Sequence, residues 1–556
     1  MARAPASSLA SLFRPIGFVA AGLAQALSMA SPVGGKPLWW LQLLSLGAFV
    51  WLLDGLRAQG PGWRRSGLHG WLFSTAWLTG SFWWLFISMH TYGGLPAPLA
   101  AIAVLALAAA LGLYYAVAAA WFVVRGPKAR VTGALVFAAL WTLAELVRGS
   151  WFTGFPWGAG GYAHVEGPLA ALAPWVGVYG IGAAAALAVA LVALHRPIHI
   201  AEAIQGVVLI AFVFAVPNLV PALRDDVQGA KGAAGNLSVA LLQGNIPQDE
   251  KFIPGGGIET ALRWYGEQLR DAKASLVVTP ETALPLLPQQ LPAGYLEAIK
   301  ARYSQGNQAA IVGLPLGGQG TYSNAVLGFR PGDAQPYAYS KHHLVPFGEF
   351  IPWGFRWFIQ MMNIPLGDFA RGGLAQAPFV WQGQRIAPNI CYEDLFGDEI
   401  GANFRDEGTA PTILLNVSNI AWFGDTVAID EHLSISRMRA LEFARPMVRS
   451  TNTGATVVID AQGRVTHELP RLTRGVLEAT VEGRRGLTPF ARWVAPLGLW
   501  PLWLLAMAIV AVAWVLGTGP SPRLKTVRLP EPPSPASRAA CPGSAGPAGR
   551  NASSPR

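Results

Sequence analysis

The sequence has 556 residues, of which 52% are hydrophobic and only 13% are charged, and it contains 22 Trp. These values argue against a soluble enzyme of three or four domains and are typical of a polytopic membrane protein. The formal net charge is +10, but the basic residues lie mostly in short loops and a tail, as membrane topology would place them. We therefore expect no nucleic-acid partner.

Apolar segments long enough to cross a membrane alternate with short polar breaks over the first part of the chain. Each is close to the ~20 residues that a hydrocarbon core of ~30 Å requires. One more apolar segment follows near the C-terminus, so the sequence predicts eight spans. They are expected at 12–32, 37–53, 69–89, 97–124, 131–147, 168–194, 201–221 and 490–517.

The Arg and Lys residues predict the orientation of these spans. With a cytoplasmic N-terminus, the opposite short loops carry only Lys36 and Arg148. Both termini are then cytoplasmic, and the segment between the seventh and eighth spans lies outside. The basic start, the apolar stretch from Ile16 and the small residues 28–31 also suit a cleavable signal peptide. Cleavage would leave seven spans without moving the large domain.

The segment from 225 to 488 predicts one α/β domain. Helical patterns at 259–272 and 431–443 alternate with short apolar runs. Continuous apolar runs favour sheets that are buried on both faces. The strands are expected at 237–242, 275–279, 309–313, 411–416 and 455–459.

This pattern predicts four parts of the chain. A seven-span bundle occupies 1–224, the α/β domain 225–488 and the final span 489–518. The remaining 519–556 is rich in Pro, Ser, Ala and Gly, a composition typical of disorder. We expect it to be a cytoplasmic tail.

The chain has two cysteines, too few for a disulfide framework. Cys391 follows a predicted strand in the run 389–396, whereas Cys541 lies in the tail, across the membrane. A free thiol on the oxidising side calls for an explanation. A lone cysteine is often a small buried hydrophobe, but Cys391 is a candidate nucleophile if a base and a cation come from elsewhere.

Two further polar residues stand at the ends of apolar runs. Glu281 follows 276–279, and Lys341 follows 337–340. A carboxylate, an ammonium and a thiol at strand ends are the parts of an acyl-transfer site: a base, an oxyanion-stabilising cation and a nucleophile. Each residue alone has an ordinary alternative, because Glu after Pro often begins a helix and Lys after a strand is usually solvated.

The order Glu, Lys, Cys and its context resemble the nitrilase superfamily. With the membrane spans, the chain resembles one family in it, the bacterial apolipoprotein N-acyltransferases. The resemblance extends from the first span to the last and leaves out the tail. The matching runs are 148–149, 153–157, 242–248, 280–283, 341–352, 389–394, 421–425, 437–442, 445–446 and 449–452.

The resemblance implies an αββα sandwich on an eight-span α-helical bundle. Glu281 would be the general base, Lys341 the oxyanion-stabilising cation and Cys391 the nucleophile. The family also requires acidic residues near the thiol. Glu349 and Glu393 match these, and we expect them to orient Lys341. Tyr392 matches the residue after the nucleophile, whose backbone N–H completes an oxyanion hole.

The resemblance also implies a two-step acyl transfer in the bacterial inner membrane, with the α/β domain on the periplasmic side. A Cys thioester would take the sn-1 chain of a phospholipid, expected to be phosphatidylethanolamine. The acceptor would be the α-amine of the N-terminal S-diacylglyceryl cysteine of an apolipoprotein, in the last step of lipoprotein maturation. No metal or other cofactor is expected.

Aromatic and Met side chains are candidates to hold the lipid and shield the thioester. They are Phe252, Trp353, Phe358, Met362, Trp422 and Trp157. An ordinary core or an interfacial aromatic belt explains them equally well. Two positions depart from the family pattern, since Thr279 and Phe252 stand where the family often has Trp.

Two other functions are weighed against the transferase. The same three catalytic residues would serve a membrane-tethered amidase or nitrilase, but a hydrolase of small amides needs neither eight spans nor an apolar lid. A transporter or scaffold should carry paired charges within its spans. We find only Glu145 and Glu202, which lie near span ends. The expected paired charges are therefore not found, and the transferase is favoured over a transporter or scaffold.

Overall fold

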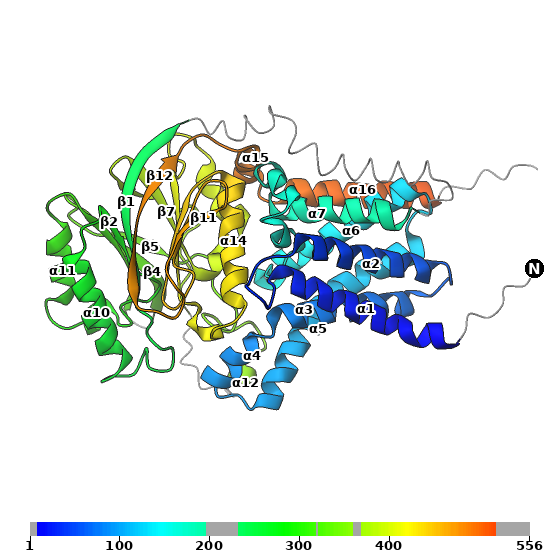
Figure 1. Ribbon diagram of the computed structural model, residues 1–556, viewed down its shortest axis with the longest axis horizontal. Helices are drawn as coiled ribbons and strands as arrows, with labels where there is room; N and C mark the ends of the chain where they lie inside the picture. Colours follow the sequence, from blue (N-terminus) through cyan, green and yellow to red (C-terminus); the bar gives the residue numbers. More distant parts are fainter. Residues whose placement is uncertain (1–7, 196–231, 319–320, 360–368, 519–556) are drawn as a thin grey trace, which may run out of the picture. The chain divides into compact units, whose positions relative to one another are not determined.

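The computed structural model describes residues 8–195, 232–318, 321–359 and 369–518. Residues up to Gly517 form one compact unit. Within it, an α-helical bundle adjoins a part built from two β-sheets (Figure 1). The predicted disorder of the tail concerns 519–556, which lies outside the described residues.

Each of the first six predicted spans coincides with a helix of the bundle. Four of these helices, α2, α5, α6 and α7, are by themselves long and apolar enough to cross a membrane. The span predicted at 201–221 lies outside the described residues. The helices are α1 (Ser8–Met29), α2 (Trp39–Arg57), α3 (Trp63–Phe82), α4 (Leu85–Ile87), α5 (Ala97–Arg125), α6 (Arg130–Ser150) and α7 (Ala173–Ala193).

The last predicted span, 490–517, is broken into two helices. α15 (Pro489–Leu497) and α16 (Trp500–Thr518) are bent by 87° relative to each other. The bend falls at Gly498, whose φ of +55° suits a residue without a Cβ. Phe490 and Val494 of α15 pack in an apolar cluster with Phe443 of the α/β part. α15 therefore contributes to the core of this domain, and α15 and α16 qualify as a candidate span only when the bent pair is taken together.

The α/β part is built on two six-stranded sheets. The strand order is β12-β1-β2-β3-β4-β5 in one sheet and β11-β10-β9-β8-β7-β6 in the other. β1, β2 and β3 are parallel, as are β7, β8 and β9. The strands are β1 (Ala233–Gln243), β2 (Leu276–Val278), β3 (Ala309–Gly318), β4 (Thr321–Phe329), β5 (Tyr337–Ser340), β6 (Phe379–Trp381), β7 (Gln384–Ile390), β8 (Ile413–Ser418), β9 (Met447–Thr451), β10 (Val457–Ile459), β11 (Val465–Glu468) and β12 (Gly475–Arg484).

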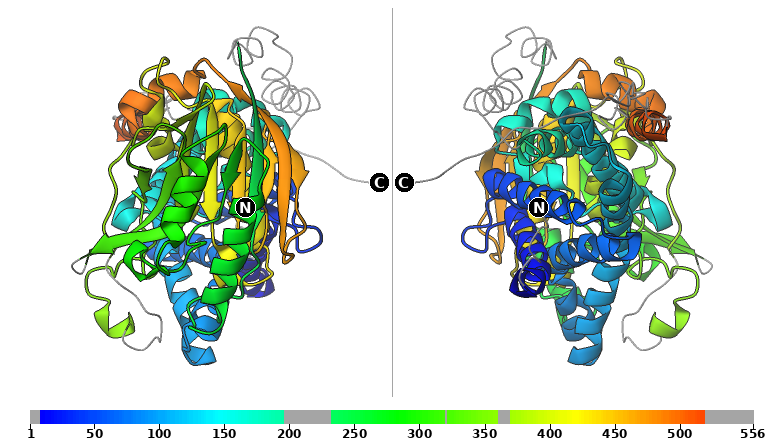
Figure 2. Two further views of the ribbon diagram at one scale, coloured as in Figure 1. Left: turned by 90° about the vertical axis from the view of Figure 1, so that its left-hand side faces the viewer. Right: turned by 90° about the vertical axis from the view of Figure 1, so that its right-hand side faces the viewer.

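The sheets face each other, and helices cover their outer faces, which gives an αββα sandwich (Figures 1 and 2). β1 explains the arrangement, because successive side chains of a strand point to opposite faces and both faces of β1 are apolar. Leu237 and Leu241 pack between the sheets. Ala240 and Leu242 pack on the other face, in the cluster that includes residues of α10 (Gly257–Asp271) and α11 (Tyr295–Tyr303). The prediction of sheets buried on both faces is confirmed.

α14 (Ala428–Phe443) lies between the second sheet and the helical bundle (Figure 1). Its residues Ile429 and Ile435 belong to the same apolar cluster as the bundle helices. The ion pair of Arg437 with Glu166, 2.7 Å, crosses the same boundary. α14 is therefore shared by the core of the bundle and the core of the sandwich.

Candidate active site

The three residues predicted at strand ends come together at one end of the sandwich. Glu281 lies three residues beyond β2, Lys341 directly follows β5 and Cys391 directly follows β7. β2 and β5 belong to one sheet and β7 to the other, so the site forms where the two sheets face each other. Glu281 and Lys341 are both close enough to Cys391 to act on its thiol electrostatically.

Cys391 occupies a strained turn. It ends β7 and begins the short 3₁₀ helix η6 (Cys391–Leu395) with a φ of +52°, a left-handed conformation that is costly for a residue with a Cβ. Such strain persists only where surrounding contacts impose it. The thiol is free, and in this conformation it lies near Glu281 and Lys341.

Glu281 is held by donors on both of its carboxylate oxygens. The side-chain amide of Asn324 donates to Oε1 at 2.7 Å, and the backbone N–H of Asn419 donates to Oε2 at 2.8 Å. Lys341 Nζ lies 3.6 Å from Oε1. These contacts come from both sheets, and they fix the carboxylate in one orientation, as a positioned base requires.

Lys341 is only 1% exposed and is held mainly by Glu349. Its Nζ lies 3.0 Å from Oε1 and 2.9 Å from Oε2 of Glu349. The Asn324 amide also donates to Glu349, at 2.8 Å, so one amide joins the two carboxylates. Burial works against the ammonium charge, but Glu349 and Glu281 outweigh it and raise the pKa of Lys341 above its usual value. Lys341 is therefore a fixed cation.

Glu393 has a different environment from the one we expected. It accepts hydrogen bonds from the backbone N–H groups of Ile390, His342 and His343, at 2.6, 2.6 and 3.2 Å. The Tyr339 hydroxyl donates to it at 2.9 Å. No direct bond from Glu393 to Lys341 occurs among the described residues. Glu393 thus ties the turn at Cys391 to the segment that follows Lys341, while Glu349 is the carboxylate that contacts the ammonium most closely.

The thiol of Cys391 is protonated at rest. Desolvation and then Glu281 raise its pKa to about 12, although Lys341 and the nearby Ser418 act in the opposite direction. A nucleophilic step must therefore remove the proton as the sulfur attacks. Glu281 and Glu349 both act electrostatically on this thiol, so a carboxylate that could accept the proton lies nearby.

A second buried lysine, which sequence reasoning missed, lies beside these residues. Lys251 is 2% exposed, and its Nζ donates to the backbone oxygen of Glu281 at 3.3 Å. Burial lowers the pKa of Lys251 to about 8, against the opposing effects of Glu281 and Cys391. The sequence offered one signal for Lys251, its position shortly after the matching run 242–248. The site thus contains two ammonium groups rather than one.

The expected lipid-contacting residues divide into exposed and buried groups. Trp353 is 97% exposed, and Phe252 is also exposed. Phe358 is half-buried against the start of α5. The Trp422 ring packs edge-on against the Tyr92 ring, with centroids 5.8 Å apart. Met362 lies outside the described residues. The exposure of Trp353 argues against the alternative that this segment is simply core.

Trp157, expected either to hold the lipid or to belong to an interfacial aromatic belt, is instead buried inside the protein. It is buried between the bundle and α14, and its indole N–H donates to Glu431 at 2.8 Å. Trp84 donates to the same carboxylate oxygen at 3.1 Å. In this structure the two indoles join the bundle to the sandwich.

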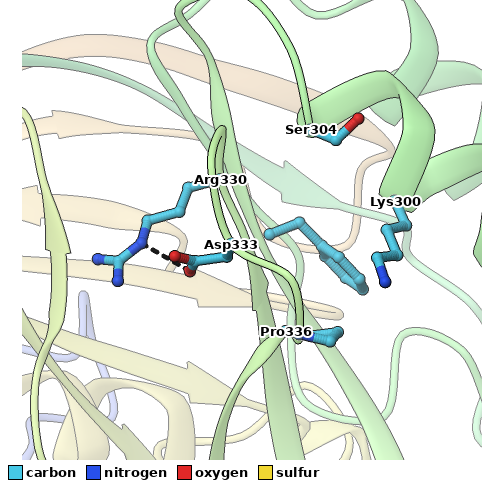
Figure 3. A pocket seen from close by; sticks show the side chains of 6 residues that line it. Lys300, Ser304, Arg330, Asp333 and Pro336 are labelled. Atoms are coloured by element: carbon cyan, nitrogen blue, oxygen red, sulfur yellow. Dashed lines mark hydrogen bonds and ion pairs between the residues drawn. The ribbon is translucent and has the colours of Figure 1, made fainter.

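A small surface pocket beside β4 is lined by fewer charged side chains than the Cys391 site (Figure 3). Its charged groups already have partners: Lys300 donates to the Ala334 oxygen at 2.9 Å, and Arg330 pairs with Asp333 at 2.7 Å. The pocket therefore has no counterpart of the free thiol and the buried charged groups that surround Cys391.

Comparisons with known proteins agree with both halves of the chain. Residues 21–191 match the model of the apolipoprotein N-acyltransferase N-terminal domain, and residues 238–489 match the carbon-nitrogen hydrolase model. The second half is also similar to a solved CN-hydrolase superfamily protein from Xanthomonas campestris, at 19% identity and a TM-score of 0.35. That similarity covers 48% of this chain and 96% of the other. The sandwich and its site thus define a carbon-nitrogen hydrolase domain joined to a bundle of apolar helices.

Two relatives extend over nearly the whole chain. An apolipoprotein N-acyltransferase from Verminephrobacter eiseniae is 57% identical over 493 residues, which is 86% of this chain and 92% of the relative. One from Ralstonia nicotianae is 46% identical over 461 residues, which is 82% of this chain and 86% of the relative. The chain belongs to the apolipoprotein N-acyltransferase family.

Proposed function

We propose that this chain N-acylates apolipoproteins in the last step of lipoprotein maturation, and that Cys391 carries the acyl group as a thioester. The observation that carries the proposal is the meeting of the free thiol of Cys391 with a positioned carboxylate and a fixed ammonium, Glu281 and Lys341. The 57% identity to a relative of this activity supports the same reaction.

In the first half-reaction, Glu281 takes the thiol proton as Cys391 Sγ attacks the carbonyl carbon of a phospholipid sn-1 ester. Lys341 and the backbone N–H of Tyr392 stabilise the oxyanion of the tetrahedral intermediate. As the second residue of η6, Tyr392 has an N–H without an intrahelical acceptor. The C–O bond then breaks, and the leaving alkoxide takes the proton from Glu281. The products are a thioester and a lysophospholipid.

In the second half-reaction, the α-amine of an S-diacylglyceryl cysteine attacks the thioester carbonyl. Glu281 removes a proton from the attacking amine, and the same two donors hold the new oxyanion. The C–S bond breaks, and the Cys391 thiolate recovers its proton from Glu281. An amide on the apolipoprotein and free enzyme result.

The donor is a phospholipid and the acceptor carries a diacylglyceryl anchor, so the site should lie at a membrane surface. Phosphatidylethanolamine is the proposed donor, and Phe252, Trp353, Phe358, Met362 and Trp422 are proposed to contact acyl chains. The exposure of Trp353 and Phe252 supports such contacts. A hydrophobic cover would also protect the thioester from water.

We further propose eight spans in the bacterial inner membrane, with both termini cytoplasmic and the sandwich in the periplasm. The distribution of Arg and Lys supports this orientation, and the apolar helices support membrane insertion. A reporter enzyme that is active only in the periplasm should be active when fused within 225–231 and inactive when fused after 520. The reverse pattern would contradict the orientation.

The reaction is tested with purified protein, phosphatidylethanolamine carrying a labelled sn-1 chain, and a peptide with an N-terminal S-diacylglyceryl cysteine. The proposal predicts labelled amide on the peptide and an equal amount of lysophospholipid. Labelled free fatty acid, with or without the peptide, would instead indicate a hydrolase. An N-acetylated peptide is the matched control, since its blocked amine should accept no label.

A further inference from the structure

The carbonyl oxygen of Cys391 has two side-chain donors. His432 Nε2 lies 3.1 Å from it, and the Asn416 amide donates to it at 3.3 Å. This carbonyl belongs to the peptide that joins Cys391 to Tyr392. Because a trans peptide directs its C=O and N–H to opposite sides, donors that hold the carbonyl also fix the direction of the Tyr392 N–H.

The ring of His432 has one possible tautomer in this setting. Arg449 Nη2 lies 2.8 Å from Nδ1, and a guanidinium can only donate. Nδ1 must therefore accept, so Nε2 carries the hydrogen and donates it to the Cys391 carbonyl. Burial and the neighbouring Arg449 lower the pKa of His432 well below its usual value, which keeps the ring neutral.

The surroundings of His432 restrict its movement. Arg449 also pairs with Asp394 at 3.4 Å, and Ser436 bonds to both of these residues. Asp394 lies 4.0 Å from Nε2, too far for a competing hydrogen bond. On its other side the imidazole packs against the Trp157 ring, with centroids 5.5 Å apart. The ring is thus fixed by α14, by β9 and by the loop after α6.

We propose that His432 is a positioning residue, which holds the Cys391–Tyr392 peptide so that the Tyr392 N–H faces the developing oxyanion. The inference rests on the proposed acyl transfer and adds a residue to it. Through Trp157, which packs on His432 and bonds to the adjacent Glu431, the bundle takes part in holding the oxyanion hole. His432 itself touches no reacting atom.

Two substitutions separate the contacts of His432. The amide of His432→Asn reaches roughly as far as Nδ1, so it can keep the Arg449 contact but not the carbonyl contact. The amide of His432→Gln reaches roughly as far as Nε2 and can donate to the carbonyl again. His467→Asn is the matched control, because His467 is exposed on β11.

Each variant is assayed twice: for the rate of thioester formation from labelled phospholipid, and for the rate of Cys391 alkylation by iodoacetamide. Alkylation forms no oxyanion, so a lost oxyanion donor leaves it unchanged. His432→Asn should form the thioester on the order of 10² more slowly, yet alkylate within about threefold of wild type. His432→Gln should recover most of the thioester rate.

The inference is overturned if His432→Asn forms thioester at the wild-type rate, or if both rates fall together, as general disruption of the site would cause. It is also overturned if His432→Gln is as slow as His432→Asn. A wild-type protein that alkylates normally but forms no thioester would instead reject the proposed function itself. The two failures are therefore distinguishable.

Discussion

Replacing Lys251 by Met should stabilise the protein while slowing its chemistry. The side chain is buried, and its ammonium donates a hydrogen bond to the Glu281 backbone oxygen at 3.3 Å. Burial lowers the pKa of Lys251 from the usual 10.5 to about 8. At 1.36 kcal/mol for each pH unit, burying this ammonium at pH 7 costs about 3 kcal/mol. Met has a similar length and no charge, so Lys251→Met should recover an energy of this order.

The lowered pKa of Lys251 also makes the free energy of unfolding depend on pH. Between about pH 8 and pH 10.5 the folded protein binds fewer protons at Lys251 than the unfolded chain does. Wild-type stability should therefore rise with pH through that window, whereas the Lys251→Met variant lacks this contribution. The difference in unfolding free energy between the two should shrink from about 3 kcal/mol at pH 7 toward zero near pH 10.5.

The same substitution removes a cation that acts on the Cys391 thiol. We expect iodoacetamide to alkylate Cys391 on the order of tenfold more slowly in Lys251→Met at pH 7. Unfolding in mixed detergent micelles measures the stability, and Lys273→Met is the control because the Lys273 side chain is not buried. A variant that is less stable than wild type, or equally reactive, would refute the reasoning.

Three further predictions concern the site residues, the contact between α14 and the bundle, and the C-terminal tail. Glu281→Gln and Lys341→Ala should each lower thioester formation on the order of 10² or more, while the control Glu297→Gln, on the surface helix α11, stays at the wild-type rate; near-normal turnover in either site variant would reject its role. Burial raises the pKa of Glu431 to about 8 despite its two indole donors, so the folded state binds the extra proton and wild-type stability should fall from about pH 4.5 to pH 8. Glu431→Gln should remove up to about 1.4 kcal/mol per pH unit from that slope in the same unfolding assay, and an unchanged slope would contradict the assignment. Truncation after Pro520 should leave acyl transfer intact, and a dead truncation would show that the tail is required.

The sequence predicted the elements whose signals are local. The apolar runs that became β1, β2, β3, β8 and β10 are continuous and short, and the structure confirms them as strands. Cys391, Glu281 and Lys341 were found because each stands where an apolar run ends. Their convergence depends on more than strand pairing, because β5 pairs antiparallel with β4 and β7 belongs to the other sheet, so the two sheets must face each other to bring the three residues together.

Other features depend on contacts between distant parts of the chain. Lys251 and His432 sit in polar runs that resemble solvated surface, and only the fold buries them beside Glu281 and Cys391. Glu393 was expected to orient Lys341, but its partners are backbone N–H groups that become available only when the turn at Cys391 forms.

The break at Gly498 was missed for a related reason. α15 runs almost directly into the strongly apolar α16, and hydropathy cannot distinguish burial in lipid from burial in a protein core. Phe490 and Val494 pack on the sandwich, so the first part of this apolar segment belongs to a protein core.

The most direct test of the account is a search for the acyl-enzyme before any acceptor is present. Purified protein is mixed with phospholipid carrying a tagged sn-1 chain, and the protein is then examined for the tag. The account predicts a tag that hydroxylamine removes and that is absent from Cys391→Ser. No tag on folded wild-type protein, or an equal tag on Cys391→Ser, would contradict the claim that Cys391 carries the acyl group.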